Sequence, residues 1–400
     1  MEPRLHRGAV NSDDVPVIVL CKEATGLATV RALADAGMEV HAFLLDRGDP
    51  LAWSRHGRKI EAFGLDRDEP ALLSRLIDCA IALGRRPVVL PTSDATALML
   101  ALHGASLGSV CRVSSTSHDQ LQSIVRKERL YETARTAGLP VLPFLFSPDH
   151  AALAEWTVTR PGPYLLKPSY VGAASAAMGA RNQVVADRQS LVGQAQRHGL
   201  RGVLVQPLQR GGDGEIFDTY GCSDHRGCIT ALASHRRWRQ YRVDLGSTCF
   251  GEIPAQLPAR QESTLRTLTE RLLRCMPYHG IFGIEWLRDA SSGDFYLLDF
   301  NARPFLCIGH LCDCGLNLPW LACRDLIGAV PATPPHGFTL QHRFWLDLRR
   351  DLYARQSTPR AQRGSCWTWL ASQMRASSYA YWRWTDPGPW MRATMQLVSR

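Results

Sequence analysis

The sequence predicts an α/β protein that begins with a doubly wound unit, continues into a mixed α+β region and ends in a helical extension. Short apolar runs alternate with helical runs over about the first 115 residues. Later, two apolar runs flank a turn-rich stretch, which is typical of an antiparallel hairpin. Residues 330–337 are rich in proline and predict a linker before the last segment.

The first unit, residues 1–115, is predicted to contain four strands and two helices. The expected strands span residues 17–20, 39–45, 59–63 and 87–90, and the expected helices span residues 27–36 and 70–83. Residues 21–26, which follow the first strand, contain only one glycine, Gly26. A dinucleotide-binding turn needs the pattern G-x-G-x-x-G, so we do not expect NAD binding.

Residues 91–94 follow the fourth strand at its carboxyl end, where open α/β sheets place ligand-binding loops. Ser93 and Asp94 are therefore candidate substrate residues, and Asp94 could bind an amine. The competing interpretation is that Asp94 or Thr92 caps the helix expected at residues 95–103. Residues 104–108 match the nucleophile pattern G-x-S-x-G, but they follow a helix rather than a strand, so a hydrolase is not predicted.

Lysine is rare in this chain, because 42 of the 46 basic residues are arginine. The lysines are Lys22, Lys59, Lys127 and Lys167. Lys127 lies in a helix predicted over residues 119–137. Lys167 ends a strand predicted over residues 163–168, and the small residues of 169–179 follow it. Small residues let backbone N–H groups approach an anion, so this region predicts phosphate binding.

A strand is expected over residues 203–209, then a turn over 210–215 and a second strand over 216–220. Adenine lies between apolar side chains and forms hydrogen bonds along one edge. We expect that edge to meet Gln206, Leu208 and Gln209. Asp213 or Glu215, in the turn, could accept hydrogen bonds from ribose hydroxyls.

The hairpin pattern covers residues 281–300, with Glu285 and Asp299 on paired strands. Asp299, Asn301 and Arg303 alternate with apolar residues, so all three point to one face. Two carboxylates and an amide oxygen suit Mg²⁺, and an arginine can bind a phosphate through two N–H groups. A half-exposed hairpin whose polar face meets water is the alternative.

Taken together, these residues resemble the ATP-grasp superfamily over residues 116–330, in particular its carboxylate-amine ligases, such as D-aspartate ligase, and the ATP-binding domain of carbamoyl-phosphate synthetase. The resemblance implies two α+β subdomains that hold ATP between them, with a lid at about residues 127–205. It makes Lys127 and Lys167 phosphate ligands, and Lys167 and Arg303 catalytic residues. The implied metal ligands are Glu285, Asp299 and Asn301, with Mg²⁺ as the metal or Mn²⁺ in its place.

Two further features fit the same resemblance. Residues 1–115 resemble the domain that precedes ATP-grasp in such ligases. Arg237, Arg239 and Arg242 resemble a basic strand that faces the acidic substrate, and Arg239 and Arg242 are our substrate candidates. The alternative is that these three residues are ordinary surface arginines with no role in substrate binding.

Composition limits where the protein works. The N-terminal stretch lacks an apolar signal segment, and no run of 18 apolar residues occurs. We expect neither secretion nor a membrane span, no membrane partner, and a cytoplasmic location. The twelve cysteines contain no C-x-x-C pair, so free, mostly buried thiols are predicted.

The last segment, residues 338–400, is predicted to be a helical extension. Residues 340–400 contain ten arginines, three aspartates and six of the eleven tryptophans. Arginines interleaved with aromatic residues can bind nucleic acid. The tryptophans are spaced like the packed faces of short helices, however, so we expect an extension that packs on the core or helps to form a homodimer.

We therefore predict an ATP-dependent carboxylate-amine ligase that forms an acyl phosphate and releases ADP. The expected substrates are a small carboxylate, an amino acid by expectation, and an amine; nucleic acid is not expected. One alternative is an ATP-grasp enzyme with a thiol or hydroxyl acceptor. Another is a non-catalytic ATP-binding or RNA-binding protein that uses the basic extension.

Overall fold

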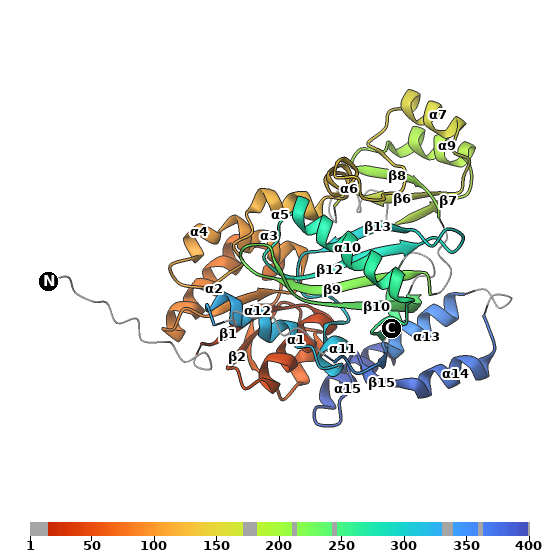
Figure 1. Ribbon diagram of the computed structural model, residues 1–400. Helices are drawn as coiled ribbons and strands as arrows, with labels where there is room; N and C mark the ends of the chain where they lie inside the picture. The colour runs from red at the N-terminus through yellow and green to blue at the C-terminus, as the bar shows by residue number, and fades with distance from the viewer. Residues whose placement is uncertain are drawn as a thin grey trace.

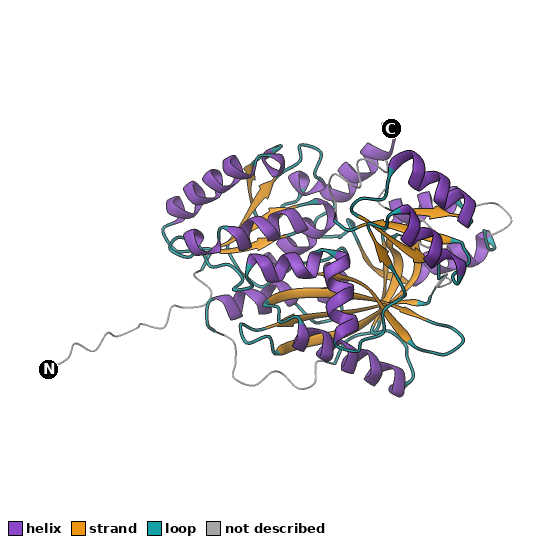
Figure 2. Cartoon of the chain, turned by 90° about the horizontal axis from the view of Figure 1, so that it is seen from above, coloured by secondary structure: helices purple, strands orange, loops and turns teal. Residues whose placement is uncertain are grey.

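The computed structural model describes residues 15–170, 182–209, 214–241, 246–329, 339–358 and 363–398. Their strands form three sheets with helices packed around them (Figure 1). Seen from above, helices cover the strands on several sides (Figure 2). None of the helices in these residues is long and apolar enough to cross a lipid bilayer.

The N-terminal sheet is parallel, with strand order β3-β2-β1-β4. Alternate residues of β1 belong to two different hydrophobic clusters, Val17 and Val19 to one and Ile18 and Leu20 to the other. Both faces of the sheet are thus buried, which explains the continuous apolar run and confirms the doubly wound prediction. The elements are β1 Val17–Cys21, α1 Glu23–Asp35, β2 Val40–Leu44, β3 Arg58–Glu61, α2 Glu69–Leu83, β4 Val88–Pro91, α3 Asp94–Leu102 and α4 Gly104–Leu107.

The central sheet has seven strands in the order β13-β12-β9-β10-β11-β14-β15. All neighbouring strands are antiparallel except β14 and β15. One face packs against α5, α6 and α10, and the other contributes to the cluster that includes α1, α11 and α12. The elements are β9 Ile216–Ser223, β10 Ile229–Tyr241, β11 Ser247–Ile253, α10 Ala259–Cys275, β12 Gly280–Arg288, β13 Phe295–Asn301, α11 Ile308–Asp313 and α12 Leu318–Leu326.

The single helix expected over residues 119–137 is wrong. The structure has two helices, α5 His118–Val125 and α6 Lys127–Thr136, separated by Arg126 in an extended conformation. The Lys127 N–H donates to the Ser169 carbonyl at 3.2 Å instead of to the carbonyl four residues earlier. Lys127 therefore starts a helix rather than lying in the middle of one.

The third sheet has the order β5-β8-β6-β7 and forms the upper part of the molecule in Figure 1. It lies in the region where the resemblance implies a lid, and we use the name lid for it. It has a hydrophobic cluster of its own, centred on Tyr164, Leu166 and Val205. The elements are β5 Leu145–Phe146, α7 His150–Val158, β6 Tyr164–Pro168, β7 Gln183–Val185, α9 Arg188–His198 and β8 Val203–Pro207.

The C-terminal segment contributes strands as well as helices. Its strands β14 Arg343–Leu346 and β15 Ala376–Tyr379 extend the central sheet, and its helices are α13 Leu348–Ser357, α14 Cys366–Arg375 and α15 Gly388–Val398. The expected packing of the tryptophans is confirmed for Trp345, which is 1% exposed. Trp367 and Trp384 do not pack on the core, because they are 80% and 84% exposed in this chain.

The last turn of the chain is joined to the first domain. Asp386 is buried and forms an ion pair with Arg31 of α1 at 2.9 Å. The Ser54 hydroxyl donates to the same carboxylate, next to the short helix η2 Pro50–Trp53, on which α15 packs. The C-terminal segment is therefore part of the folded body.

Candidate active site

The predicted hairpin is confirmed as β12 and β13. Glu285 lies directly opposite Asp299, and Gly283 lies opposite Asn301. The Glu285 and Asp299 side chains are 24% and 31% exposed, and both line a cavity of about 600 Å³. Arg303 lines the same cavity, so the hairpin brings the predicted metal ligands and the predicted catalytic arginine together.

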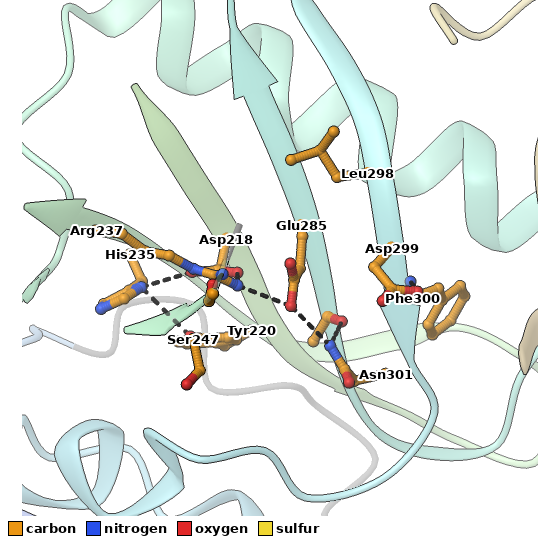
Figure 3. Close-up of polar contacts among 12 residues, drawn as sticks. Asp218, Tyr220, His235, Arg237, Ser247, Glu285, Leu298, Asp299, Phe300 and Asn301 are labelled. Carbon is orange, nitrogen blue, oxygen red and sulfur yellow. Dashed lines mark hydrogen bonds and ion pairs between the residues drawn. The ribbon is translucent and has the colours of Figure 1, made fainter. Parts of the chain in front are cut away.

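A continuous chain of polar contacts runs across the strands that face this cavity (Figure 3). Arg237 donates from Nη2 to Glu285 Oε1 at 2.8 Å, and Asn301 donates from Nδ2 to the same oxygen at 3.2 Å. Arg303 then donates from Nη2 to Asn301 Oδ1 at 3.0 Å and from Nε to Asp94 Oδ1 at 2.6 Å. The chain of contacts therefore links β10 of the central sheet to α3 of the N-terminal domain.

Asp218 anchors the buried end of this chain. Its carboxylate accepts from Arg237 Nε at 2.9 Å and lies 2.7 Å from His235 Nδ1. Burial would raise the pKa of Asp218, but the Arg237 guanidinium and then His235 outweigh it and lower the pKa to about 2. Sequence reasoning missed Asp218. The available signal was one acidic residue inside a strand, β9, whose residues are all buried.

The two predicted phosphate lysines come from different elements, Lys127 from the start of α6 and Lys167 from β6. Lys127 Nζ is 2.6 Å from Asp299 Oδ2, and this carboxylate outweighs burial and raises the pKa of Lys127. Lys167, on β6 of the lid, is 7% exposed and donates to the Tyr131 hydroxyl at 3.3 Å. Burial, helped by the Lys127 charge, lowers the pKa of Lys167 to about 8.

A smaller cavity of about 100 Å³ lies beside the lysines. Gln206, Leu208 and Gln209 all line it, as do Lys127 and Lys167. Gln206 is 1% exposed, and none of the described residues offers a hydrogen bond to its Oε1. The Leu208 N–H donates to the Pro163 carbonyl at 2.7 Å, and Gln209 donates to Asp289 at 2.6 Å.

Two predicted ligand residues lie away from these cavities. Glu215 forms a two-bond ion pair with Arg288, at 2.7 and 3.0 Å. Arg239 pairs with Asp351 of α13, because the strand pairing shifts register between Arg237 and Arg239 and turns the latter to the other face of the sheet. The remaining two candidates, Asp213 and Arg242, lie outside the described residues.

The loop after β4 is arranged differently from either capping alternative. Ser93 is the N-cap of α3, since its hydroxyl accepts from the Thr96 N–H, so capping by Asp94 or Thr92 is wrong. Thr92 instead donates to the Leu20 carbonyl at 2.7 Å. Asp94 is thereby free of a capping role, and its carboxylate binds Arg303.

The cavities of about 600, 370 and 100 Å³ share lining residues, and we call them together the cleft. The C-terminal segment also reaches it. Arg350 of α13 lines both the 600 Å³ cavity and an adjoining cavity of about 370 Å³. It is held by Asp347 and Glu23, each at 3.3 Å, and by the Ser247 hydroxyl. No local pattern in the sequence distinguishes Arg350 from the other arginines of this segment.

The oxygen atoms around Glu285 fit a hard divalent cation. The set consists of two carboxylates and one amide oxygen, on adjacent strands, partly exposed to the cavity. Among the described residues, no group of three or more His, Cys, Asp or Glu side chains is arranged to hold a metal ion by itself. The cations of Lys127, Arg237 and Arg303 contact these oxygens and compensate their charge.

Comparison with protein-family models and with curated protein sequences found no match. Solved structures do match. An ADP complex of N5-carboxyaminoimidazole ribonucleotide synthetase is 13% identical, with a TM-score of 0.64, and the match covers 82% of this chain and 81% of that one.

Two further structures give the same result. The biotin carboxylase domain dimer of Hydrogenobacter thermophilus 2-oxoglutarate carboxylase, with MgADP and bicarbonate, is 15% identical (TM-score 0.64, covering 82% and 73% of the two chains). The L-amino acid ligase from Bacillus licheniformis is 14% identical (TM-score 0.61, covering 82% and 79%). With its three sheets, its lid and these matches, the chain has the ATP-grasp fold.

Proposed function

We propose that this protein is an ATP-dependent carboxylate-amine ligase that works through an acyl phosphate. One observation carries the proposal: two adjoining cavities are lined by the two lysines, by the carboxylates of Glu285 and Asp299, and by Arg303. A carboxylate and a triphosphate repel each other strongly unless cations offset their charges. This cleft supplies such cations from the lid, the central sheet and the C-terminal segment.

The small cavity is the proposed nucleotide-base site. The unpaired Oε1 of Gln206 is a buried acceptor that an exocyclic amine could satisfy, and leaving it unpaired is unfavourable. Lys127 and Lys167 line the same cavity. If the base of a nucleotide is bound there, its phosphates lie within reach of both ammonium groups. Proteins with this fold were solved with ADP and MgADP, which supports the assignment.

Glu285, Asp299 and Asn301 would hold Mg²⁺, which would neutralise phosphate charge. Binding there would draw Asp299 away from Lys127 and free that ammonium group for a phosphate oxygen. Arg303 would similarly exchange its Asp94 partner for the phosphoryl group. The protein's own contribution is thus a set of charges positioned before the reaction begins.

In the proposed reaction, an oxygen of the substrate carboxylate attacks the γ-phosphorus and the bond to ADP breaks. The amine nitrogen then attacks the acyl carbon, phosphate leaves and the nitrogen loses a proton, which gives an amide. The similarity to an L-amino acid ligase supports an amino acid as the carboxylate. Asp94, whose carboxylate faces the 370 Å³ cavity beside Arg303, is the proposed contact for the incoming amine.

Hydroxylamine tests this route directly, because it intercepts acyl phosphates. With ATP, Mg²⁺ and a panel of amino acids, the enzyme should form a hydroxamate and release ADP without its natural amine. Lys167→Ala and Arg303→Ala should both suppress the product. The lysine change should also weaken nucleotide binding, whereas the arginine change should act mainly on turnover.

An ATP-grasp enzyme with another acceptor or another activation route would give different products. AMP release, or a stable phosphorylated alcohol, would refute the acyl-phosphate route and leave the nucleotide site intact. A purely RNA-binding role has less support, because β14 and β15 build the C-terminal segment into the central sheet.

A further inference from the structure

Helix α14 turns polar side chains towards the protein and apolar side chains towards solvent. Its inward side chains are polar: Trp369 Nε1 and Gln373 donate to Asp351 at 2.8 and 2.6 Å, and Ser372 accepts from Arg239 at 2.9 Å. None of its residues is fully buried. The helix is therefore held by hydrogen bonds rather than by an apolar face.

The apolar residues of α14 lie on the opposite side. Trp367, Leu370 and Met374 are spaced by three and four residues, so they form one stripe on a helix, and they are 80%, 46% and 82% exposed. Nine of the 15 exposed large hydrophobic side chains in the described residues follow residue 339. The three side chains of α14 therefore form an apolar stripe on one helix rather than scattered single exposures.

The carboxylate that contacts α14, Asp351, is 1% exposed and forms an ion pair with Arg239, so the exposed charge beside the stripe comes from arginines. Residues 352–400 contain seven arginines, no lysine and one acidic residue, Asp386, which is 2% exposed and paired with Arg31. Arg375 is exposed at the end of α14, and Arg355 stacks on Trp369 at its side. The partner must therefore accept apolar side chains and be negatively charged.

We propose that α14 docks the enzyme onto the interface of an anionic lipid bilayer. A short helix with a tryptophan-containing stripe and flanking arginines places the stripe at the acyl boundary and the guanidinium groups at the lipid phosphates. This contact is peripheral and revises the expectation that the protein has no membrane partner. In Figure 1, α14 lies at the lower edge and the lid at the upper edge, so docking leaves the lid free.

Two other occupants fit less well. A second copy paired through the same surface would bring two arginine-rich segments together without exposed carboxylates to balance them. Single-stranded nucleic acid stacks its bases on aromatic rings, but two of the three stripe residues are aliphatic. Of these three occupants, the bilayer matches both the apolar stripe and the positive charge.

Vesicle flotation of the full-length protein tests the proposal, with phosphatidylcholine vesicles and with vesicles that also contain phosphatidylglycerol. We expect binding to the mixed vesicles that weakens with added salt. The combined variant Trp367→Ser, Leu370→Ser, Met374→Ser should bind at least about tenfold more weakly. Ile81→Ser, which changes a 61%-exposed residue on the remote helix α2, is the matched control and should bind like the wild type.

Thermal melting and ADP release should be unchanged in both proteins, because none of these side chains lines the cleft. Equal vesicle binding by wild type and triple variant would overturn the proposal, as would no binding to the mixed vesicles. If the triple substitution instead abolished a concentration-dependent dimer or an affinity for RNA, the surface would belong to that partner and not to lipid.

Discussion

Replacing Asp218 by asparagine tests the buried anchor of the cleft. The Asp218 and Arg237 side chains are 1% and 6% exposed, so water cannot replace a lost contact. Removing one partner from a buried pair costs about 3–5 kcal/mol. Glu285 remains 2.8 Å from Arg237 and keeps part of its charge compensated, so we expect the lower end, about 3 kcal/mol.

The matched control is Glu215→Gln. The pair of Glu215 with Arg288 has similar distances in the same sheet, but both side chains are 17–18% exposed and neither lines the cleft. Water reaches this pair, so its contribution should lie nearer to the about 0–1 kcal/mol of exposed pairs than to that of a buried pair, and the variant should lose less stability than Asp218→Asn. Chemical denaturation of wild type and both variants measures the difference.

Turnover and pH provide two further readouts. Because Arg237 also holds Glu285, Asp218→Asn should lower the rate of ADP release at least about tenfold, a loss of about 1.4 kcal/mol. The folded pKa of Asp218 is depressed to about 2, so its contribution is present above the ordinary carboxyl pKa and is lost as pH falls towards 2. The stability gap between wild type and variant should therefore narrow below about pH 4. If Asp218→Asn matched Glu215→Gln in stability and turnover, the anchoring role would be refuted.

Three further predictions concern the nucleotide, the metal and the C-terminal segment. Asp299→Asn should lower Mg²⁺-dependent turnover by roughly 10²–10³ without unfolding the protein, and wild-type ADP release by a folded variant would exclude Asp299 as a metal ligand. Because the pKa of Lys167 is about 8, the dissociation constant of ATP, measured by calorimetry, should rise by up to about tenfold per pH unit above pH 8; a flat profile to pH 9.5, about 1.5 units higher, would contradict a phosphate role. Deletion of residues 339–400 removes two strands of the central sheet and exposes the edge of β11, so the product should aggregate, and a soluble, active truncation would show that the segment is dispensable.

The parts of the site that the sequence predicted depend on local periodicity. Asp299, Asn301 and Arg303 alternate along one strand, and a strand places alternate residues on one face whatever else surrounds it. For this reason the polar face that carries the proposed metal ligands was predictable, and so was the order of strands and helices in the N-terminal unit. The residue opposite Glu285 does not follow from the turn alone, because a register shift between Glu285 and Trp286 places Asp299 there.

The parts that were missed depend on distant segments. Asp218 gains its role only because β9 pairs with β10 and β12. The start of α6 at Lys127 depends on a carbonyl group at Ser169, and the orientation of Arg239 depends on a register shift against β11. These contacts are set by tertiary structure, which local residue patterns do not encode.

The ion pair between Arg31 and Asp386 has a consequence for biosynthesis. The two residues are 355 positions apart, so at ~5–20 residues per second the ribosome needs roughly 20–70 s to make the partner of Arg31. During that interval α1 carries a cation that is buried in the finished protein but has no counter-ion. The N-terminal sheet is therefore synthesised well before the residue that neutralises Arg31, and until Asp386 is made the Arg31 guanidinium has to remain solvated.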